Sequence, residues 1–347
     1  MIKAGVVGAT GYAGSELLRI LMQHPEVEVK TLTAKSYVGQ KYNEIYENYR
    51  DINESVCEEM DIYKLADECD VIFMALPHGV AAKVVDEEIL SKTKVIDFGA
   101  DFRIKDADVY EKWYGVEHTG RELLKKAVYG LCEVNRDDIK KANLIANPGC
   151  YTTCSILSLR PLLAEGVIDE DSIIIDAKSG VTGAGRGLAT TSLYCEVNET
   201  IKAYKIASHR HTPEIEEQLG YACGKNINLI FTPHLTPMNR GILATCYAKL
   251  KGNYTYDDIK KIYEKHYGNE YFIRLTKEGV FPETRWVKGS NFLDIGFKID
   301  EITGRIIVIG AIDNLVKGAA GQAVQNMNIL FGLPENTGLQ LVPVFPA

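Results

Sequence analysis

The fold is decided near the N-terminus, where Lys3-Ala-Gly-Val-Val7 runs into Gly8-Ala-Thr-Gly-Tyr-Ala-Gly14 and then into Ser15-Glu-Leu-Leu-Arg-Ile-Leu-Met22. The first segment is typical of a buried strand, and the third has the apolar rhythm of a helix. A strand, a glycine turn and a helix in this order present the start of the helix to a pyrophosphate. The spacing is G-x-x-G-x-x-G, which differs from the standard G-x-G-x-x-G. We therefore predict a dinucleotide site formed by Gly8, Thr10, Gly11, Tyr12, Ala13 and Gly14.

Strands and helices continue to alternate to about residue 147. Buried strands are predicted over Asp70–Leu76, Lys94–Gly99 and Asn143–Asn147, and a helix over Val80–Leu90. This alternation predicts an α/β fold with a doubly wound parallel sheet of the Rossmann type. Ligands of such sheets bind at the carboxyl ends of the strands.

The second half of the chain has longer strands. They predict an α+β domain with a mixed, mostly antiparallel sheet and helices on one face. A helix over Asp257–Tyr267 follows a capping signal formed by Thr255 and Asp258, and Asp313 or Asn314 caps a last helix, Leu315–Leu330. The predicted strands are Ser172–Lys178, Asn228–Phe231, Gly241–Leu250, Tyr271–Leu275, Phe292–Ile299 and Arg305–Ile312.

Two domains follow from this change of pattern. The Gly318-Ala-Ala-Gly321 run of the last helix allows close approach of the backbone, and we expect this helix to return to the first domain. Residues 1–147 and 314–347 would then form an NADP-binding domain. Residues 148–313 would form the catalytic, substrate-binding and oligomerisation domain.

The residues after the second strand indicate which dinucleotide binds. Strand Val27–Thr33 continues into Ala34, Lys35 and Ser36, with no acidic side chain. NAD sites usually end this strand with an acid that holds the ribose 2′-hydroxyl, whereas a lysine and a hydroxyl suit a 2′-phosphate. We therefore expect NADP(H) at Lys35 and Ser36. The alternative is that both are ordinary residues of a solvated loop, and the missing acid is the stronger part of the argument.

Asn147-Pro-Gly-Cys150 leads directly into the helix-forming stretch Tyr151–Leu159. This places Cys150 at or next to a helix N-terminus, where free N–H groups and the helix dipole favour thiolate over thiol. A small buried residue at a tight turn is the structural alternative. Because a dinucleotide site and two histidines accompany it, we interpret Cys150 as a nucleophile.

A cysteine nucleophile needs an acid/base partner, and Ser208-His-Arg-His-Thr-Pro-Glu214 offers one. Thr212 suits a helix N-cap and Pro213 the first helical position, so His211 would lie just outside a helix start. Histidine has the pKa needed to accept and donate protons. A metal site at His209 and His211 is disfavoured because no third ligand lies nearby in sequence.

Two further segments are typical of anion sites. Lys178-Ser-Gly-Val-Thr-Gly-Ala-Gly-Arg186 is glycine-rich, and its backbone N–H groups at Ser179 and Gly180 could hold a phosphate or carboxylate, with Arg186 alongside. Arg103 follows a strand end, and its guanidinium could bind a phosphate through two hydrogen bonds. Each arginine could equally form an ordinary salt bridge.

Composition is that of an ordinary globular enzyme of 347 residues, with 46% apolar and 25% charged residues. A net charge of −8 argues against nucleic acid or an anionic membrane as a partner. No apolar run reaches the length of a membrane span, and Met1-Ile-Lys leads straight into the first strand, so we expect a cytoplasmic protein. The eight scattered cysteines contain no C-x-x-C pair and are typical of reduced thiols.

Together these features predict attack of a thiolate on an acyl phosphate, reduction of the resulting thioester by NADPH, and release of an aldehyde assisted by histidine. The sequence resembles the N-acetyl-gamma-glutamyl-phosphate reductase family of arginine biosynthesis nearly from end to end. The segments that carry the resemblance begin at Gly8, Leu76, Ala100, Asn147, Lys178, His209, Thr232 and Asp313.

The resemblance implies reduction of N-acetyl-L-glutamyl 5-phosphate to its 5-semialdehyde by NADPH, with Cys150 as nucleophile and His211 as acid/base. Substrate contacts are assigned to Arg103, Ser179, Gly180, Arg186 and His209, and further cofactor contacts to Pro77 and Asn314, with no metal. It also implies a cytoplasmic homo-oligomer, usually a tetramer. Many members have proline after Cys-Tyr, where this chain has Thr152, and we expect little consequence.

Three alternatives stay open at this stage. A reductase of lysine biosynthesis that acts on a carrier-bound aminoadipyl phosphate should show a basic docking surface, which the net charge of −8 disfavours. Aspartate-semialdehyde dehydrogenase shares the chemistry but fits the motifs less well. A regulator that senses NADP without turnover would not need the cysteine and the His-Arg-His turn.

Overall fold

The computed structural model describes residues 1–346, and the chain divides into two compact units. Met1–Pro148 and Ala319–Gln340 form the first unit. Gly149–Gly318 and the segment beginning at Leu341 form the second. None of the helices within residues 1–346 is long and apolar enough to cross a membrane.

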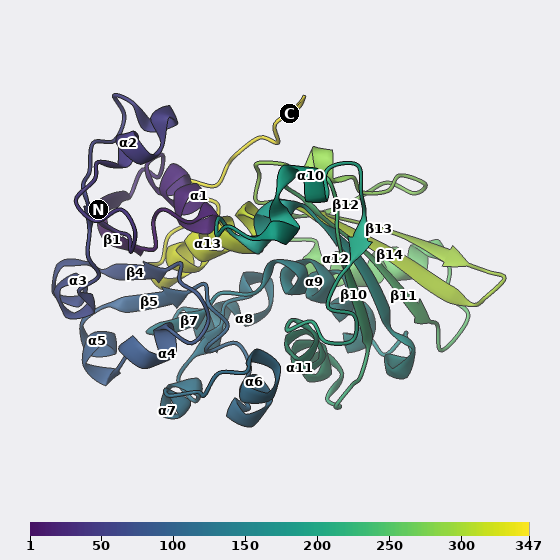
Figure 1. The fold of residues 1–347 in the computed structure, drawn as a ribbon. Helices are drawn as coiled ribbons and strands as arrows, with labels where there is room; N and C mark the ends of the chain where they lie inside the picture. The colour runs from purple at the N-terminus through teal and green to yellow at the C-terminus, as the bar shows by residue number, and fades with distance from the viewer. Residues whose placement is uncertain (347) are drawn as a thin grey trace. The chain divides into compact units, whose positions relative to one another are not determined.

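The first unit contains a seven-stranded parallel sheet in the order β3-β2-β1-β4-β5-β7-β6, as the sequence predicted (Figure 1). Its strands are β1 Ile2–Val7, β2 Val27–Thr33, β3 Cys57–Glu58, β4 Val71–Met74, β5 Lys94–Asp97, β6 Val128–Tyr129 and β7 Leu144–Ala146. Its α-helices are α1 Tyr12–Leu21, α2 Tyr42–Ile45, α3 Ile62–Glu68, α4 Ala81–Val84, α5 Glu87–Lys92, α6 Ala107–Tyr114, α7 Arg121–Leu124, α8 Cys132–Ile139 and α13 Gly321–Leu330.

The central strands of this sheet are apolar on both faces, because helices cover both. Every residue of β4 is buried, as a doubly wound sheet requires. Helices α3 and α5 pack on one side, where Leu65, Ile72 and Ile89 join one hydrophobic core. Helices α1 and α13 lie against the other side (Figure 1).

The second unit contains a mixed sheet in the order β12-β13-β14-β11-β8-β10-β9. The pairs β9–β10, β8–β11, β11–β14 and β13–β14 are antiparallel, whereas β8–β10 and β12–β13 are parallel. Its strands are β8 Ile174–Ser179, β9 Lys202–Ala203, β10 Ile230–Leu235, β11 Ile242–Lys249, β12 Ile273–Leu275, β13 Leu293–Asp300 and β14 Arg305–Ile312. Its α-helices are α9 Cys150–Ala164, α10 Tyr194–Val197, α11 Thr212–Cys223 and α12 Tyr256–Tyr267. The mixed, mostly antiparallel sheet predicted for this half is confirmed.

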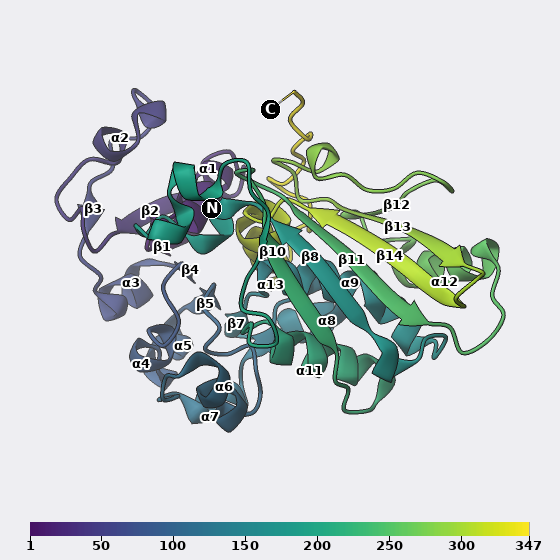
Figure 2. The same cartoon turned by 45° about the vertical axis from the view of Figure 1, so that its right-hand side comes forward.

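Helices α9, α11 and α12 lie behind this sheet in Figure 2, and the opposite face of the strands is turned toward the viewer. The burial pattern agrees, because buried and half-buried residues alternate along β8 and β11. Helix α9 is buried along almost its whole length and packs on β11 and β14. It is the element that carries Cys150 into the unit.

Two predicted helices are wrong in detail. Val80–Leu90 is split into α4 and α5, because Val85 is extended and Asp86 caps α5 by accepting from the N–H of Ile89 at 2.9 Å. The predicted helix Leu315–Leu330 begins instead with the π-helical turn Val316–Ala320 before α13. Asp313, one of the two caps that the sequence predicted, caps that turn. Its carboxylate accepts the N–H of Leu315 at 2.8 Å.

Candidate active site

Cys150 is the first residue of α9, and Gly149 is the N-cap. Since glycine has no side chain, the helix cannot be capped by its own N-cap residue. The backbone N–H of Gly149 donates instead to the Glu214 carboxylate on α11, at 3.0 Å. Cys150 is half-buried, so part of its side chain remains accessible to solvent.

The backbone of the π-helical turn passes directly over Cys150. A Cβ placed on Gly318 would lie 2.7 Å from the Cβ of Cys150. Only glycine leaves room for this approach, as the sequence predicted for the Gly318–Gly321 run. The turn therefore forms one wall beside the thiol.

The two histidines lie at the N-terminus of α11, which packs against α9. His211 is itself the N-cap and Thr212 the first helical residue, so the predicted start of this helix is one position too late. His209 is buried, and its Nδ1 accepts the backbone N–H of His211 at 3.1 Å. The two imidazole centroids are 4.8 Å apart.

Aromatic rings surround His209. The ring centroids of Tyr151, Tyr204 and Phe231 lie 5.7, 5.5 and 5.3 Å from that of His209. Burial, reinforced by Lys205 and Arg210, lowers the pKa of His209 to about 3. His209 is therefore a neutral imidazole at physiological pH.

Two tyrosines connect this aromatic cluster to the cysteine, and sequence reasoning missed both. Tyr151 follows Cys150 on α9, and the Tyr204 hydroxyl donates to the Tyr151 hydroxyl at 3.3 Å. Burial raises the pKa of Tyr204 to about 12, and the nearby Cys150 charge acts in the same direction. Both phenols are therefore neutral hydrogen-bonding groups close to the thiol. Aromatic residues next to a motif carry no sequence signal that distinguishes a site from a core.

Glu214 was also missed as a site residue. It is completely buried, and besides the N–H of Gly149 it contacts the Thr152 hydroxyl at 2.8 Å. The signal was present in the sequence, since Glu214 stands three positions after His211, where a carboxylate reaches back to a helix start. Which helix start it reaches could not be predicted, because the partner is on α9.

The residues of the predicted anion loop lie in three different places in the structure. Ser179 ends β8 and is buried, and its hydroxyl donates to the carbonyl of Gly180 at 3.0 Å. Gly180 is the N-cap of the 3-10 turn Val181–Ala184, and a Cβ there would lie 2.6 Å from the carbonyl oxygen of Asn239. Arg186 is exposed on the loop beyond this turn.

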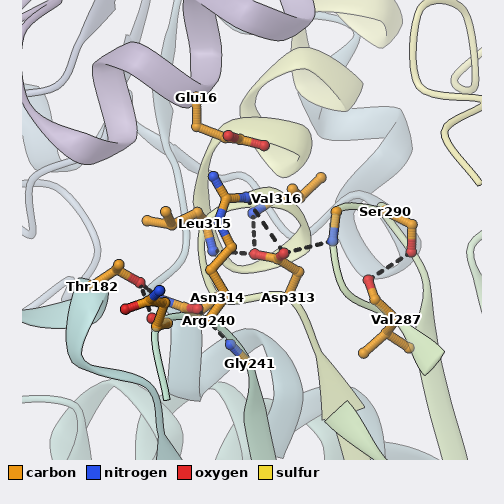
Figure 3. A network of polar contacts seen from close by, with 12 residues as sticks. Glu16, Thr182, Arg240, Gly241, Val287, Ser290, Asp313, Asn314, Leu315 and Val316 are labelled. Carbon is orange, nitrogen blue, oxygen red and sulfur yellow. Dashed lines mark hydrogen bonds and ion pairs between the residues drawn. The ribbon is translucent and has the colours of Figure 1, made fainter. Parts of the chain in front are cut away.

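Asn314 and Asp313 organise a polar network in the second unit (Figure 3). The side chain of Asn314 accepts the N–H of Gly241 at 2.8 Å and donates to the Thr182 hydroxyl at 3.0 Å. Asp313 accepts the N–H of Gly289 at 2.7 Å and pairs with Arg240 at 3.5 Å. Asn314, which the sequence predicts to contact the cofactor, joins β11 to the glycine-rich loop through these bonds.

The glycine turn of the first unit has the geometry that a dinucleotide needs. Gly8 has φ +80°, and a Cβ on Gly14 would collide with the carbonyl of Gly8. Gly11 is the N-cap of α1, which has no side-chain cap and no acid in its first turn. Such a helix start offers N–H groups to a phosphate. Tyr12, Ala13 and Gly14 open this helix, with Thr10 just before it.

Side chains from α2 and from its C-cap residue support this turn. The Tyr42 hydroxyl donates to the carbonyl of Ala9 at 3.0 Å, and the Tyr46 hydroxyl to that of Thr10 at 2.8 Å. Lys35 and Ser36 are exposed just beyond the end of β2, and Pro77 is exposed after β4. They thus follow the carboxyl ends of β2 and β4, the two strands that lie on either side of β1.

Arg103, predicted to hold a phosphate, lies in the first unit and is buried. Its Nε donates to the carbonyl of Asn147 at 2.8 Å and its Nη2 to that of Phe98 at 2.7 Å. These two donors therefore fix the backbone that leads toward Cys150. The neighbouring Asp97 is fully buried, and burial together with Asp101 raises its pKa to about 7.

Two family models match the two halves of the chain. The semialdehyde dehydrogenase NAD binding domain matches residues 3–142, and the semialdehyde dehydrogenase dimerisation domain matches residues 150–314. Solved structures with the same fold include aspartate semialdehyde dehydrogenase II from Vibrio cholerae, with a TM-score of 0.72, 18% identity, and 96% and 98% of the two chains covered. The NADP complex of the Candida albicans enzyme has a TM-score of 0.70 at 18% identity, covering 97% and 99%.

Curated relatives are much closer in sequence. The N-acetyl-gamma-glutamyl-phosphate reductase of Lachnoclostridium phytofermentans is 60% identical over 346 residues, covering 100% of both chains. The Campylobacter jejuni protein of the same name is 56% identical over 340 residues, covering 98% of each. This chain therefore belongs to the N-acetyl-gamma-glutamyl-phosphate reductase family of the semialdehyde dehydrogenases.

Proposed function

We propose that this chain catalyses the NADPH-dependent reduction of N-acetyl-L-glutamyl 5-phosphate to N-acetyl-L-glutamate 5-semialdehyde and phosphate, in arginine biosynthesis. The observation that carries the proposal is the position of Cys150. Cys150 is the first residue of α9, and a hydrogen bond from Gly149 to Glu214 joins the start of α9 to α11. Helix α11 begins at the His-Arg-His turn. This arrangement lies in a chain 60% identical to a reductase of that name.

Cys150 is the nucleophile in this proposal. Its thiolate attacks the acyl carbon of the substrate, the carbon–oxygen bond to the phosphate breaks, and a thioester forms. The helix N-terminus stabilises the thiolate, because unpaired N–H groups and the helix dipole favour negative charge there. When bound, NADPH supplies the hydride that the reduction requires.

His211 is the acid/base. It protonates the oxygen that gains charge when the thioester is reduced, and it takes the hydroxyl proton back when the aldehyde leaves and Cys150 is regenerated. His209 has its pKa lowered to about 3 by burial. It stays neutral and serves as a fixed hydrogen-bond donor to the substrate.

We propose that the first unit binds NADP(H) and that the second performs catalysis. Support comes from the glycine turn and the uncapped start of α1, which suit a pyrophosphate. Lys35 and Ser36 would hold the 2′-phosphate, with Pro77 and Asn314 as further contacts. Ser179, Gly180, His209, Arg103 and Arg186 would hold the substrate and the departing phosphate.

We propose a cytoplasmic homotetramer built on contacts between second units. The sheet face opposite α9 carries half-buried side chains, and the matching family model is described as a dimerisation domain. A second copy packed there would bury Ile174, Lys178, Leu243, Thr245, Tyr247, Ile307 and Ile309.

Sedimentation velocity tests this interface. The double variant Ile307→Glu/Ile309→Glu should dissociate into smaller species because it places charges in the contact. Ile302→Glu is the control, since Ile302 is 96% exposed in the turn that joins β13 to β14. An unchanged sedimentation coefficient for the double variant would contradict the interface.

The activity is tested in reverse, by NADPH formation from N-acetyl-L-glutamate 5-semialdehyde, NADP and phosphate. The proposal requires a rate that depends on all three. Aspartate semialdehyde should be a much poorer substrate, and aminoadipate semialdehyde on its carrier protein should give no rate. Faster turnover of either one, or binding of NADP with no turnover of any, would overturn the proposal.

A further inference from the structure

The third residues of α9 and α11 meet inside the second unit. Thr152 is the third residue of α9 and Glu214 the third of α11, and both are completely buried. The Thr152 hydroxyl lies 2.8 Å from Oε1 of Glu214, and the same oxygen accepts the N–H of Gly149 at 3.0 Å. One carboxylate oxygen thus bridges the N-cap and the first turn of the helix that carries Cys150.

The hydroxyl proton of Thr152 has two acceptors within reach. The carbonyl of Gly149 lies 2.7 Å away, but it already accepts the N–H of Thr153 at 2.9 Å and the Thr153 hydroxyl at 3.0 Å. Those two donors occupy both lone pairs of the carbonyl oxygen, whereas Oε1 of Glu214 lies 2.8 Å from the Thr152 hydroxyl. The Thr152 proton is therefore directed to Glu214.

This contact completes a capping box from two helices. In a helix that caps itself, the third residue is a glutamate that accepts the N–H of the N-cap. In α9 the third residue is threonine, which is too short for that task, and the glutamate comes from the third position of α11. Because His211 is the N-cap of α11 and Cys150 the first residue of α9, the shared box fixes the two reacting groups relative to each other.

We propose that Thr152 is a positioning residue for the reaction. Its hydroxyl holds the Glu214 carboxylate on the start of α9 and so sets the position of Cys150 relative to His211. A proline, which the resemblance leads one to expect here, would stiffen the turn through its fixed φ but could donate no hydrogen bond. The inference rests on the proposed function of Cys150 and His211.

Thr153 provides a matched control for the test. It is the next residue of the same turn and is equally buried, and its hydroxyl donates to the same Gly149 carbonyl and not to Glu214. The variants are Thr152→Val, which removes the hydroxyl at nearly constant shape, Thr152→Ser, which keeps it, and Thr153→Val. Thermal unfolding and NADPH binding report whether each variant is folded.

Thr152→Val should lower kcat about 10-fold to 100-fold, the range expected when reacting groups are displaced slightly. Its KM for NADP should change less than about twofold, since the cofactor turn is untouched. Thr152→Ser should restore kcat, and Thr153→Val should keep it. Alkylation of Cys150 by iodoacetamide can be followed on its peptide by mass spectrometry. It should need a higher pH in Thr152→Val, because the start of α9 then stabilises the thiolate less.

Equal losses of kcat in Thr152→Val and Thr153→Val would overturn the inference, as would a Thr152→Val enzyme with wild-type kcat and alkylation profile. Should Thr152→Val not fold, Thr152→Ala and Thr153→Ala are compared in the same way. A wild-type protein without phosphate-dependent turnover would refute the proposed function instead. The alkylation profiles would still decide whether Thr152 positions Cys150.

Discussion

The imidazoles of His209 and His211 lie with their centroids 4.8 Å apart, and the backbone N–H of His211 donates to Nδ1 of His209 at 3.1 Å. Nδ1 of His209 is therefore the acceptor, so in the neutral ring the proton is on Nε2. Since burial lowers the pKa of His209 to about 3, this ring can donate a hydrogen bond but cannot serve as the titrating acid. In the proposed mechanism His209 is therefore the fixed hydrogen-bond donor, and His211 is the acid/base.

His211→Asn should lower kcat by about 10²–10⁴, the usual range for general acid–base catalysis. His209→Asn should lower it less and leave the pH dependence of kcat in its wild-type shape. Steady-state kinetics across pH on both variants check this division. A larger loss at His209 would reverse the assignment.

The same pKa predicts a change in acid stability. The folded value of about 3 lies below the ordinary value of 6.5. The unfolded chain therefore binds a proton first as the pH falls from about 6.5 toward 3, and stability is lost over that window. His209→Asn should make denaturant unfolding less sensitive to pH between about 4 and 7 relative to wild type.

Asp97 predicts the opposite trend. Burial together with Asp101 raises its pKa from 3.8 to about 7, so the folded state binds the proton more tightly and stability is lost as the pH rises from about 4 to about 7. Its Oδ1 accepts the N–H of Gly99 at 2.8 Å, a bond that asparagine keeps. Asp97→Asn should therefore raise the free energy of unfolding more at pH 8 than at pH 5. Equal effects at both values would contradict the raised pKa.

The approach of Gly318 to Cys150 gives a steric prediction. A Cβ on Gly318 would lie 2.7 Å from the Cβ of Cys150, so Gly318→Ala must push the two apart. We expect a loss of roughly 1–3 kcal/mol in stability, as for other overpacked sites, and a larger proportional loss of kcat than of NADPH affinity. Gly187→Ala is the control, because no atom lies within 4 Å of its added Cβ. Wild-type turnover in Gly318→Ala would show that this wall does not constrain the thiol.

Much of this fold could be predicted because it follows from local patterns. The glycine turn before α1 and the Pro-Gly turn before Cys150 are examples. In each, the residues of the turn themselves determine where the next helix begins. The break at Val85 was missed because Asp86 caps a new helix inside a stretch with continuous apolar rhythm. The helix propensity of the residues favours one continuous helix there. The hydrogen bond from the N–H of Ile89 to the Asp86 side chain starts a second helix instead.

The predicted site was incomplete because its missing members are joined by tertiary contacts. Glu214 meets Gly149 across 65 residues of sequence, and Tyr204 meets Tyr151 across 53. Neither pairing leaves a spacing that a single sequence can reveal. The residue type of Arg103 was enough to suggest that it binds a phosphate. Its hydrogen bonds to the carbonyls of Asn147 and Phe98 could not be predicted, because they form only in the folded chain.

Cofactor preference follows from the end of β2. Lys35 and Ser36 are exposed there, and no acid ends the strand. A charge-assisted contact of roughly 1.5–3 kcal/mol predicts about a 10-fold to 150-fold preference for NADPH over NADH. Ser36→Asp should erode or invert that preference, mainly by weakening NADPH binding. Equal kcat/KM for the two cofactors in the wild type would refute this role of the loop and leave the cysteine mechanism intact.

Cys150→Ser should bind NADPH normally and lose turnover, because a serine hydroxyl is hardly ionised at neutral pH. Alanine or serine at the other seven cysteines should leave activity largely intact. Retention of more than about a tenth of the wild-type rate in Cys150→Ser would argue against covalent catalysis.

The most direct test of covalent catalysis is a rapid-mixing experiment without phosphate. Wild-type enzyme mixed with NADP and N-acetyl-L-glutamate 5-semialdehyde should give a burst of one NADPH per active subunit, and mass spectrometry should find one N-acetylglutamyl group on Cys150. Added phosphate should release that group and start steady turnover, and Cys150→Ser should show no burst. A steady phosphate-independent rate, or phosphate-dependent turnover without any acyl group on Cys150, would contradict the account.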